Sequence, residues 1–435
     1  MLDELRQAAA RQRTERALRA LVLGCKRLLS ERGEMNGMPI ARELIDRLDA
    51  LSDDQLDGFF DYLARDLSPD PQQVLRLAQA YAATPTAEAL IPLVRAAEPP
   101  RQELLRRLNR TPGGTAAILR LRRALLGRLK ARPELQAIEA DLLHLLGSWF
   151  NPGFLQMRRV DWNSPAQLLE KLIQHEAVHA IDGWNDLRRR LQPDRRCFAF
   201  FHPQLPDEPL IFVEVALLPE IPAAIAPLID KAATPLPSDR FRVAAFYSIS
   251  NCEPGLRSVS LGNFLIKQVA EQLKHELPRL KTFCTLSPVP GFASWLRREP
   301  DMTSLPGLRK GAVAPLQSAF ALLQQATAGD FGVLHARATL EQLAPDAQAA
   351  LLTLCAAYLL QVSPTADGDP VARFHLDNGA RLERLNAQGD LSSKGLRQSF
   401  GIMVNYLYDL DRIEASHAKF RDGEVARSRA VGALV

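Results

Sequence analysis

The N-terminal third of the chain repeats its apolar positions with the period of an α-helix. Apolar residues recur three and four positions apart, with Arg, Glu and Gln between them, in residues 14–29, 72–82 and 103–108. Proline-containing breaks at 68–71, 98–100 and 132–133 end these segments, because proline lacks the N–H that a continuing helix needs. We therefore predict an all-helical domain over residues 1–158, and we expect it to serve oligomerisation.

After this domain the pattern becomes mixed. Asn163-Ser164-Pro165 predicts the start of a helix, because asparagine and serine cap helices and proline fits their first turn. Runs typical of strands, the first two forming an antiparallel hairpin, cover residues 196–202, 209–217, 241–250 and 281–287. Helical patterns cover residues 220–231, 259–277, 314–328 and 346–361. We predict an α+β fold in which residues 159–435 form a mixed α/β domain around a central, mostly antiparallel sheet.

A strand, a loop and a helix in residues 246–267 suggest a phosphate-binding site. The loop reads Arg257-Ser258-Val259-Ser260-Leu261-Gly262, and the helix is expected to begin there. The N-terminus of a helix presents unpaired N–H groups and the positive end of its dipole, which bind phosphate oxygens. The small residues would let a phosphate approach the backbone, and Arg257 or Lys267 could add charge. An ordinary strand-to-helix turn with the same residues is the alternative interpretation.

Composition and charge narrow the class of protein. The 435 residues, of which 47% are hydrophobic and 24% charged, suffice for two or three globular domains. The 54 basic and 50 acidic residues give a net charge of +4, which gives no support to wholesale binding of nucleic acid. The net charge is compatible with a local basic patch that binds a small anionic ligand.

Cysteine usage and the absence of targeting patterns indicate the cytoplasm. The sequence contains no Cys-x-x-Cys pair, and its odd number of scattered cysteines predicts free thiols: Cys25, Cys197, Cys252, Cys284 and Cys355. Residues 1–5 are not the start of a secretory signal, and the strongest apolar stretch, residues 349–360, is too short to span a bilayer. We expect no association with a membrane.

The sequence also contains the pattern His-Glu-x-x-His on a predicted helix. In zinc peptidases two histidines four positions apart, here His175 and His179, share one helix face and bind zinc, while the glutamate, here Glu176, activates water. The longer metzincin pattern fails, because Asp182 occupies its glycine position. The third ligand would have to come from the β region, from Glu208 or Glu214. A zinc peptidase is one alternative function, but we expect no metal.

Longer motifs in the C-terminal part resemble the malonyl-CoA decarboxylase family. They occur in the family's order: AFYSIS (245–250), LGNFLIK (261–267), LSPVPGF (286–292), DPVARFHLDNGA (369–380) and GIMVNY (401–406). The loop at 257–262 also resembles the pyrophosphate loop of the GNAT family of N-acetyltransferases, with Ser260 in place of its middle Gly or Ala. The resemblance covers residues 164–410 strongly, whereas the helical first third matches by position.

The resemblance implies that an acetyltransferase-like (GNAT) domain converts malonyl-CoA to acetyl-CoA and carbon dioxide. The reaction passes through a thioester enolate, which needs hydrogen-bond donors at its oxygen and an acid for its carbon. The catalytic pair of the family falls on Ser287 and His375, and a histidine suits the proton step because it can change charge near neutral pH. No cofactor is implied, since coenzyme A is part of the substrate.

Further site positions follow from the same resemblance. The coenzyme-binding segment falls on Arg257, Ser258, Val259, Ser260, Leu261, Gly262 and Asn263. Ser248 matches a position that the family associates with the acyl group, and Asn405 and Tyr406 are expected to line the pocket. Lys171 matches a basic position reported as essential in the family, although it could be a solvated lysine on the surface of a helix.

The resemblance also has departures and leaves alternatives. Ser260 stands where relatives can carry a glutamate, and Ala166 and Pro203 stand where cysteine-linked regulation would require cysteines. An acyltransferase that uses an acyl-CoA, and a sensor that binds acyl-CoA without turnover, remain alternative functions. Relatives imply a homo-oligomer, with a tetramer as one option. Whether methylmalonyl-CoA is accepted stays open.

Overall fold

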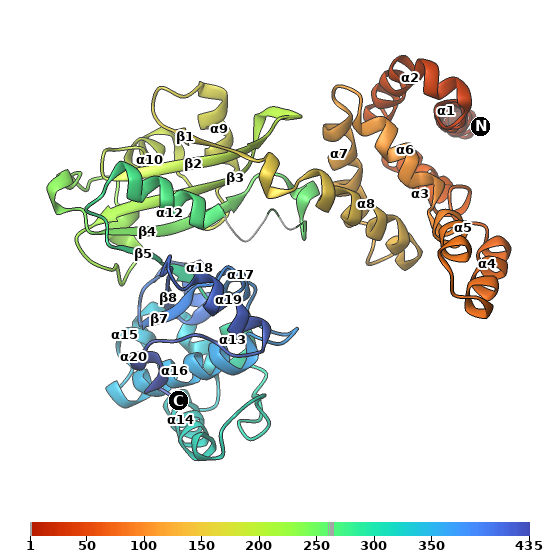
Figure 1. Cartoon of the computed structure of the whole chain (residues 1–435). Coiled ribbons are helices and arrows are strands. Elements are labelled where there is room, and N and C mark those ends of the chain that lie inside the picture. Colours follow the sequence, from red (N-terminus) through yellow and green to blue (C-terminus); the bar gives the residue numbers. More distant parts are fainter. Residues whose placement is uncertain (1, 260, 262–264) are drawn as a thin grey trace. The chain divides into compact units, whose positions relative to one another are not determined.

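The structure is a computed structural model that describes residues 2–259, 261 and 265–435 (Figure 1). The chain divides into two compact units. Unit 1 contains residues 1–156 with the segments 201–208 and 253–261, and unit 2 contains residues 157–200, 209–252 and 262–435. Two short segments of the C-terminal part thus belong to the same unit as the N-terminal helices. The boundary at residue 158 stays a prediction.

The N-terminal part of unit 1 is helical, as its pattern of apolar positions predicts. The helices are α1 (Leu2–Leu29), α2 (Glu31–Asp49), α3 (Asp53–Arg65), α4 (Pro71–Ala83), α5 (Ala87–Ala97), α6 (Pro100–Asn109), α7 (Gly114–Leu126) and α8 (Gln136–Trp149). Local signals start several of them. Ser52 and Gln55 form a capping box at α3, and the Asp70 side chain accepts a hydrogen bond from the N–H of Gln72 at the start of α4.

The sheet is built from eight strands within the described residues. They are β1 (Gln156–Val160), β2 (Arg195–His202), β3 (Leu205–Leu218), β4 (Val243–Asn251), β5 (Thr282–Thr285), β6 (Ser287–Pro288), β7 (Arg381–Asn386) and β8 (Met403–Leu407). Their order is β1-β2-β3-β4-β5-β8-β6, and β7 also pairs with β8. β4 is antiparallel to β3 and parallel to β5, while β8 is antiparallel to β5, β6 and β7. The predicted mixed domain with a mostly antiparallel sheet is confirmed.

Two details of the sheet differ from the prediction. Only two residues join β2 to β3, so the predicted loop residues Pro206 and Asp207 lie inside β3. The predicted strand at 281–287 is two short strands, β5 and β6. Pairing of β3 with β4 skips Tyr247, because Glu214 faces Ser248 whereas Val215 faces Phe246. Such a bulge re-aims the side chains that follow it.

The helices of unit 2 alternate with these strands. They are α9 (Ala166–His175), α10 (Gly183–Arg190), α11 (Ala226–Ile229), α12 (Leu265–Glu276), α13 (Phe292–Leu296), α14 (Val313–Ala326), α15 (Arg337–Glu341), α16 (Pro345–Ala357), α17 (Pro370–Asp377), α18 (Ser393–Ser399), α19 (Ile413–Arg421) and α20 (Arg429–Gly432). α12 lies within the predicted helical range 259–277 and buries Leu265, Val269 and Leu273, which follow one another at intervals of four. The helix predicted over 220–231 is wrong in extent, since only α11 is helical there. The segment after α16 continues as a π-helical turn, Tyr358–Val362.

Two features bear on the expected environment of the protein. All five cysteines are buried free thiols, as predicted from their spacing. Within the part of the chain that the structure describes, no helix combines the length and apolar character that crossing a bilayer requires.

Candidate active site

A cavity of about 250 Å³ lies inside unit 2, and we call it the Ser287 pocket. Strands β4 and β6 and helix α17 supply most of its wall. It is lined by Val178, Ile211, Phe246, Tyr247, Ser248, Ile249, Asn251, Ser287, Pro288, Pro370, Val371, Phe374 and His375. An apolar wall with a few convergent polar groups is typical of a ligand site. The volume is small for a whole coenzyme and suits one end of a larger ligand.

Ser287 and His375, predicted as a pair, meet at the wall of this pocket. Ser287 lies on β6, where its backbone pairs with Val404 of β8. His375 lies in the last turn of α17. The Oγ atom of Ser287 is 3.0 Å from the Nε2 atom of His375, and both side chains are buried. The fold thus brings together two residues that lie 88 positions apart.

Two residues that the sequence analysis missed extend this pair into a chain of hydrogen bonds. Tyr408 Oη lies 2.9 Å from Nδ1 of His375, and the Ser287 hydroxyl donates to Thr285 Oγ1 at 2.9 Å. One direction satisfies every link: Tyr408 donates to Nδ1, and Nε2–H donates to Ser287. Tyr408 follows Tyr406 by two positions, so alternation along a strand is the signal that could have found it.

His375 is held as a neutral imidazole. Burial lowers the pKa of His375 from its ordinary 6.5 to about 3, because the charged form would lose its hydration. The Tyr406 ring stacks on it, with ring centroids 4.7 Å apart. Tyr406 therefore lies beside His375 and is not among the residues that line the pocket. Asn405 is also absent from that lining and binds the Thr285 carbonyl instead.

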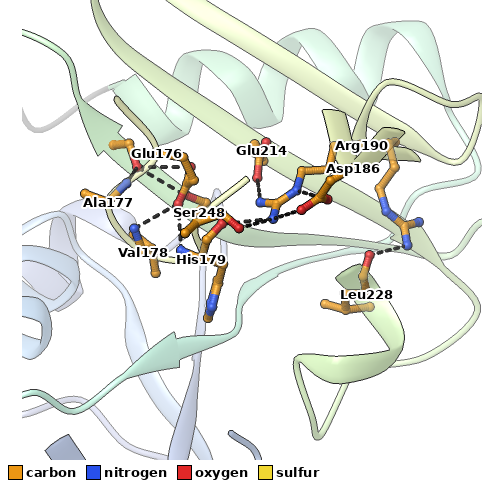
Figure 2. Close-up of polar contacts among 12 residues, drawn as sticks. Glu176, Ala177, Val178, His179, Asp186, Arg190, Glu214, Leu228 and Ser248 are labelled. Atoms are coloured by element: carbon orange, nitrogen blue, oxygen red, sulfur yellow. Dashed lines mark hydrogen bonds and ion pairs between the residues drawn. The ribbon is translucent and has the colours of Figure 1, made fainter. Parts of the chain in front are cut away.

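Ser248 lies on β4 and lines the pocket, and its hydroxyl is bound to a buried carboxylate (Figure 2). The two Glu176 oxygens lie 2.8 and 2.7 Å from Ser248 Oγ. The same carboxylate accepts from Ser250 Oγ and from the backbone N–H groups of Val178 and His179. Glu176 thereby joins β4 to the segment that contributes Val178 to the pocket wall.

The predicted helical His-Glu-x-x-His arrangement is wrong. α9 ends at His175, and Glu176 has extended backbone angles, φ −65° and ψ 107°. His175 and His179 therefore do not share a helix face. The cause is local, since the Glu176 carboxylate accepts the N–H groups of Val178 and His179 in a turn that competes with the helix. Glu176 is occupied by these hydrogen bonds and does not stand in the arrangement that activates a metal-bound water.

Glu214, considered as a third zinc ligand, belongs to a buried ion-pair network. Arg190 donates to Glu214 and to Asp186, and also to the backbone carbonyl of His179 (Figure 2). Burial raises the pKa of Glu214 to about 7, and the Arg190 charge opposes that rise. Glu208, the other considered ligand, is exposed on β3. Within the described residues no group of three His, Cys, Asp or Glu side chains is arranged to hold a metal ion.

The predicted coenzyme segment is only partly described. Arg257 and Ser258 are exposed, whereas Val259 and Leu261 are buried, so these two can offer a ligand only their backbone. Ser258 has φ +64°, which belongs to the left-handed region. Ser260, Gly262 and Asn263 lie outside the described residues. Lys171 is half-buried on α9, as its helical pattern predicts, and does not line the Ser287 pocket.

A buried arginine of the N-terminal helices holds this segment within unit 1. Arg122 of α7 donates to the carbonyl oxygens of Gly255 and Arg257, at 2.6 and 2.8 Å. Glu139 of α8 pairs with the same guanidinium group. Arg122 is completely buried, so its charge is compensated by this carboxylate and by the two carbonyls.

Comparisons with known proteins identify relatives across both units. The malonyl-CoA decarboxylase C-terminal domain matches residues 153–435, and the malonyl-CoA decarboxylase N-terminal domain matches residues 67–150. A solved malonyl-CoA decarboxylase from Rhodopseudomonas palustris is 48% identical, with a TM-score of 0.82, and the match covers 95% of this chain and 98% of that one. A second, from Agrobacterium vitis, is 46% identical, also with a TM-score of 0.82, and covers 95% and 99%.

Curated relatives are more distant and longer. The mitochondrial malonyl-CoA decarboxylase of Anser anser anser is 35% identical over 334 residues, which cover 74% of this chain and 66% of the relative. The protein of the same name from Rattus norvegicus is 36% identical over 323 residues, which cover 71% of this chain and 65% of the relative. The chain thus spans about two thirds of the length of these relatives.

Proposed function

The chain belongs to the malonyl-CoA decarboxylase family, and we propose that it removes carbon dioxide from malonyl-CoA to give acetyl-CoA. The observation that carries the proposal is the 3.0 Å contact between Ser287 and His375 at the wall of an apolar cavity. A small pocket with one serine–histidine pair suits a short acyl thioester, and the coenzyme remains part of the substrate, so no cofactor is required.

The apolar wall favours loss of the carboxylate. Malonyl-CoA enters with a negative carboxylate, which is poorly stabilised beside Ile211, Phe246 and Phe374, while the departing carbon dioxide is neutral. The bond from the central carbon to the carboxylate breaks, and its electron pair passes into the thioester as an enolate. Negative charge moves from the carboxylate to the thioester oxygen during the reaction. Surroundings that stabilise charge on the thioester oxygen therefore lower the activation barrier of decarboxylation.

The Ser287–His375 pair supplies the proton that completes the acetyl group. In the direction that satisfies all links, Nε2–H of His375 points at Ser287 Oγ, and Ser287 carries the hydroxyl proton. The enolate carbon takes the Ser287 proton and forms the new C–H bond, and Nε2–H replaces the proton on Ser287. In the same step Tyr408 gives its hydroxyl proton to Nδ1, so that His375 stays neutral, and the Tyr408 oxygen is then reprotonated from solvent, which supplies the one proton that the overall reaction consumes. An enolate is basic enough to accept a proton from a neutral donor, so His375 acts without first becoming charged.

The coenzyme part of the substrate is assigned to the segment from Arg257 to Asn263. Exposed Arg257 supplies a positive charge for a phosphate, and Ser258 and the loop backbone supply small donors. The role of Ser248 in recognising the acyl group stays a prediction, as does the role of Lys171 as an essential positive charge.

The curated relatives named above are called mitochondrial, and our prediction for this chain stays the cytoplasm. Homo-oligomerisation, with a tetramer as one option, stays a prediction as well.

Incubation of the purified protein with malonyl-CoA and no acceptor tests the function. We expect acetyl-CoA and carbon dioxide to form in equal amounts. Chromatography measures the acetyl-CoA, and trapping of the gas measures the carbon dioxide. An acyltransferase would give acyl transfer only when an amine is added, and an acyl-CoA sensor would bind the thioester without turnover. Zinc that stays bound in a stoichiometric amount through chelator treatment would support the peptidase alternative instead.

A further inference from the structure

Asp369 lies at the start of the helix that carries His375. Its Oδ1 accepts hydrogen bonds from the N–H groups of Val371 and Ala372, at 2.9 and 3.0 Å, so that it caps α17. Pro370 follows as the first helical residue. An Asp-Pro pair of this kind fixes where a helix begins and in which direction it runs. His375 follows six positions later, within the same eight-residue helix.

The second oxygen of the same carboxylate holds the segment that carries Ser287. Oδ2 accepts the backbone N–H of Gly291 at 2.8 Å, and Gly291 lies four positions after Ser287. Asp369 and Gly291 are 78 positions apart, and the Asp369 side chain is completely buried. One buried carboxylate therefore joins the two chain segments that meet again at the Ser287–His375 contact.

The connections between the two contacts are stiff. Pro288 and Pro290 lie between Ser287 and Gly291, and each fixes one backbone angle. The helical hydrogen bonds of α17 hold the spacing from Asp369 to His375. Gly291 is closely packed, because a Cβ at this position would overlap the hydroxyl of Tyr358. A displacement at Gly291 is therefore transmitted to Ser287 and is not absorbed by the loop between them.

We propose that Asp369 is a positioning residue, whose carboxylate sets the distance between Ser287 and His375 by binding the N-terminus of α17 and Gly291 together. The inference rests on the proposed function only for its kinetic consequence, since the geometric consequence can be measured without activity. Asp369 does not line the pocket and acts on the reaction through the pair that it positions.

Asp369→Asn separates the two roles of the carboxylate. Asparagine keeps an oxygen for the N–H groups of Val371 and Ala372 and turns its NH₂ group toward the Gly291 N–H, so that two donors face each other. We expect kcat to fall on the order of 10-fold to 100-fold, because small misplacements of reacting groups are costly, with KM for malonyl-CoA within about twofold of wild type. Asp369→Ser caps the helix but does not reach Gly291, and it provides a second variant should the first fail to fold.

Asp70→Asn is the matched control, because Asp70 caps α4 in the same Asp-Pro arrangement and is exposed in unit 1. Its kcat should equal that of wild type. In a His375→Ala background, Asp369→Asn should cause no further loss, since the contact that Asp369 positions is already gone. Losses that multiply in the double variant would indicate a general effect on folding and would overturn the inference.

Crystal structures of wild type and of Asp369→Asn provide the readout that is independent of activity. We expect the Ser287 Oγ–His375 Nε2 separation to exceed hydrogen-bonding distance in the variant and not in wild type. An unchanged separation overturns the positioning role whether or not the protein decarboxylates malonyl-CoA. A wild-type protein without turnover, but with a lengthened contact in the variant, would refute the proposed function and leave the positioning role standing.

Discussion

The hydroxyl of Tyr408 lies 2.9 Å from Nδ1 of His375, on the side of the imidazole opposite to Ser287. Both ring nitrogens of His375 are therefore engaged, which fixes the orientation of the ring before any substrate enters. Such preorganisation is what a proton donor needs, because no energy is then spent on aligning it during the reaction. Three predictions concern the surroundings of this histidine, and a fourth concerns the Glu176 carboxylate.

Replacement of either member of the pair should stop catalysis. Ser287→Ala and His375→Ala should each lower kcat by about 10²-fold to 10⁴-fold, the range for loss of a positioned acid or base. Ser287→Ala should leave the melting temperature close to wild type, whereas His375→Ala empties a buried site and removes the partner of the Tyr408 hydroxyl, so its melting temperature should fall and its rate is measured well below that temperature. Steady-state rates with malonyl-CoA, together with melting curves, provide the check. A variant that turns over at a near-normal rate would exclude its residue from the mechanism.

Tyr408→Phe should lower kcat while Tyr406→Phe should not. The first change removes the donor to Nδ1, and a hydrogen bond of about 1 kcal/mol in the transition state corresponds to roughly a fivefold to tenfold loss of rate. Tyr406 keeps its stacking on His375 as phenylalanine, and among the described residues its hydroxyl has no hydrogen-bond partner. Its removal should leave the free energy of unfolding unchanged or raise it. Equal kinetic losses in both variants would contradict the assigned direction of the proton chain.

The stability of the protein should fall in acid partly through His375. Burial lowers the pKa of His375 from an ordinary 6.5 to about 3 in the folded state. Between pH 6.5 and pH 3 the imidazole therefore binds a proton in the unfolded chain and not in the folded chain. The contribution of His375 is complete above pH 6.5 and is lost as the pH falls toward 3, by about 1.4 kcal/mol per pH unit. His179, with its pKa lowered to about 4, acts in the same direction.

His375→Asn provides the test, because asparagine takes up no proton in this range. The difference in the free energy of unfolding between pH 7.5 and pH 5, measured with urea, should be smaller in this variant than in wild type. Identical pH dependence in the two proteins would show that His375 is not kept neutral by burial.

Loss of the Glu176 carboxylate should destabilise the pocket wall. Glu176→Ala leaves the hydroxyls of Ser248 and Ser250 and two backbone N–H groups without their acceptor, which should cost about 3 kcal/mol or more of unfolding free energy. Glu170→Ala is the control, since Glu170 is exposed on α9 and its loss should stay within about 0.5 kcal/mol. Urea unfolding of both variants checks this, and equal stabilities would show that the Glu176 network contributes nothing.

The sequence predicted what local signals and long motifs encode. Helix α4 was predicted from the apolar period of residues 72–82, which is a local signal, and in the structure Asp70 and Pro71 start this helix. Ser287 and His375 were found from the motifs of the family, and their contact then required the fold. Thr285 and Tyr408 were missed because their roles depend on the pairing of β5 and β6 with β8, which lies more than a hundred positions further along the chain.

The prediction of a helix at Glu176 is wrong because long-range contacts override a local pattern. The spacing of His175 and His179 is compatible with a helix, and no property of these five residues reveals that Ser248 and Ser250 on a distant strand bind the glutamate. Tertiary hydrogen bonds therefore override the local period. The predicted helix over residues 220–231 fails for a different, local reason, since no side chain caps α11 and only Ala226–Ile229 is helical.

The guanidinium group of Arg122 makes the predicted domain boundary a poor place to cut the protein. Expression of residues 159–435 alone would remove the side chain that binds the carbonyls of Gly255 and Arg257, together with its counter-ion Glu139. The truncated protein would keep the serine and the histidine and lose the support of the segment assigned to the nucleotide end of the substrate. Under the proposed assignment of this segment, the helical region contributes to affinity for the substrate, and changes at Arg122 of α7 should weaken coenzyme binding even though α7 contains neither the serine nor the histidine.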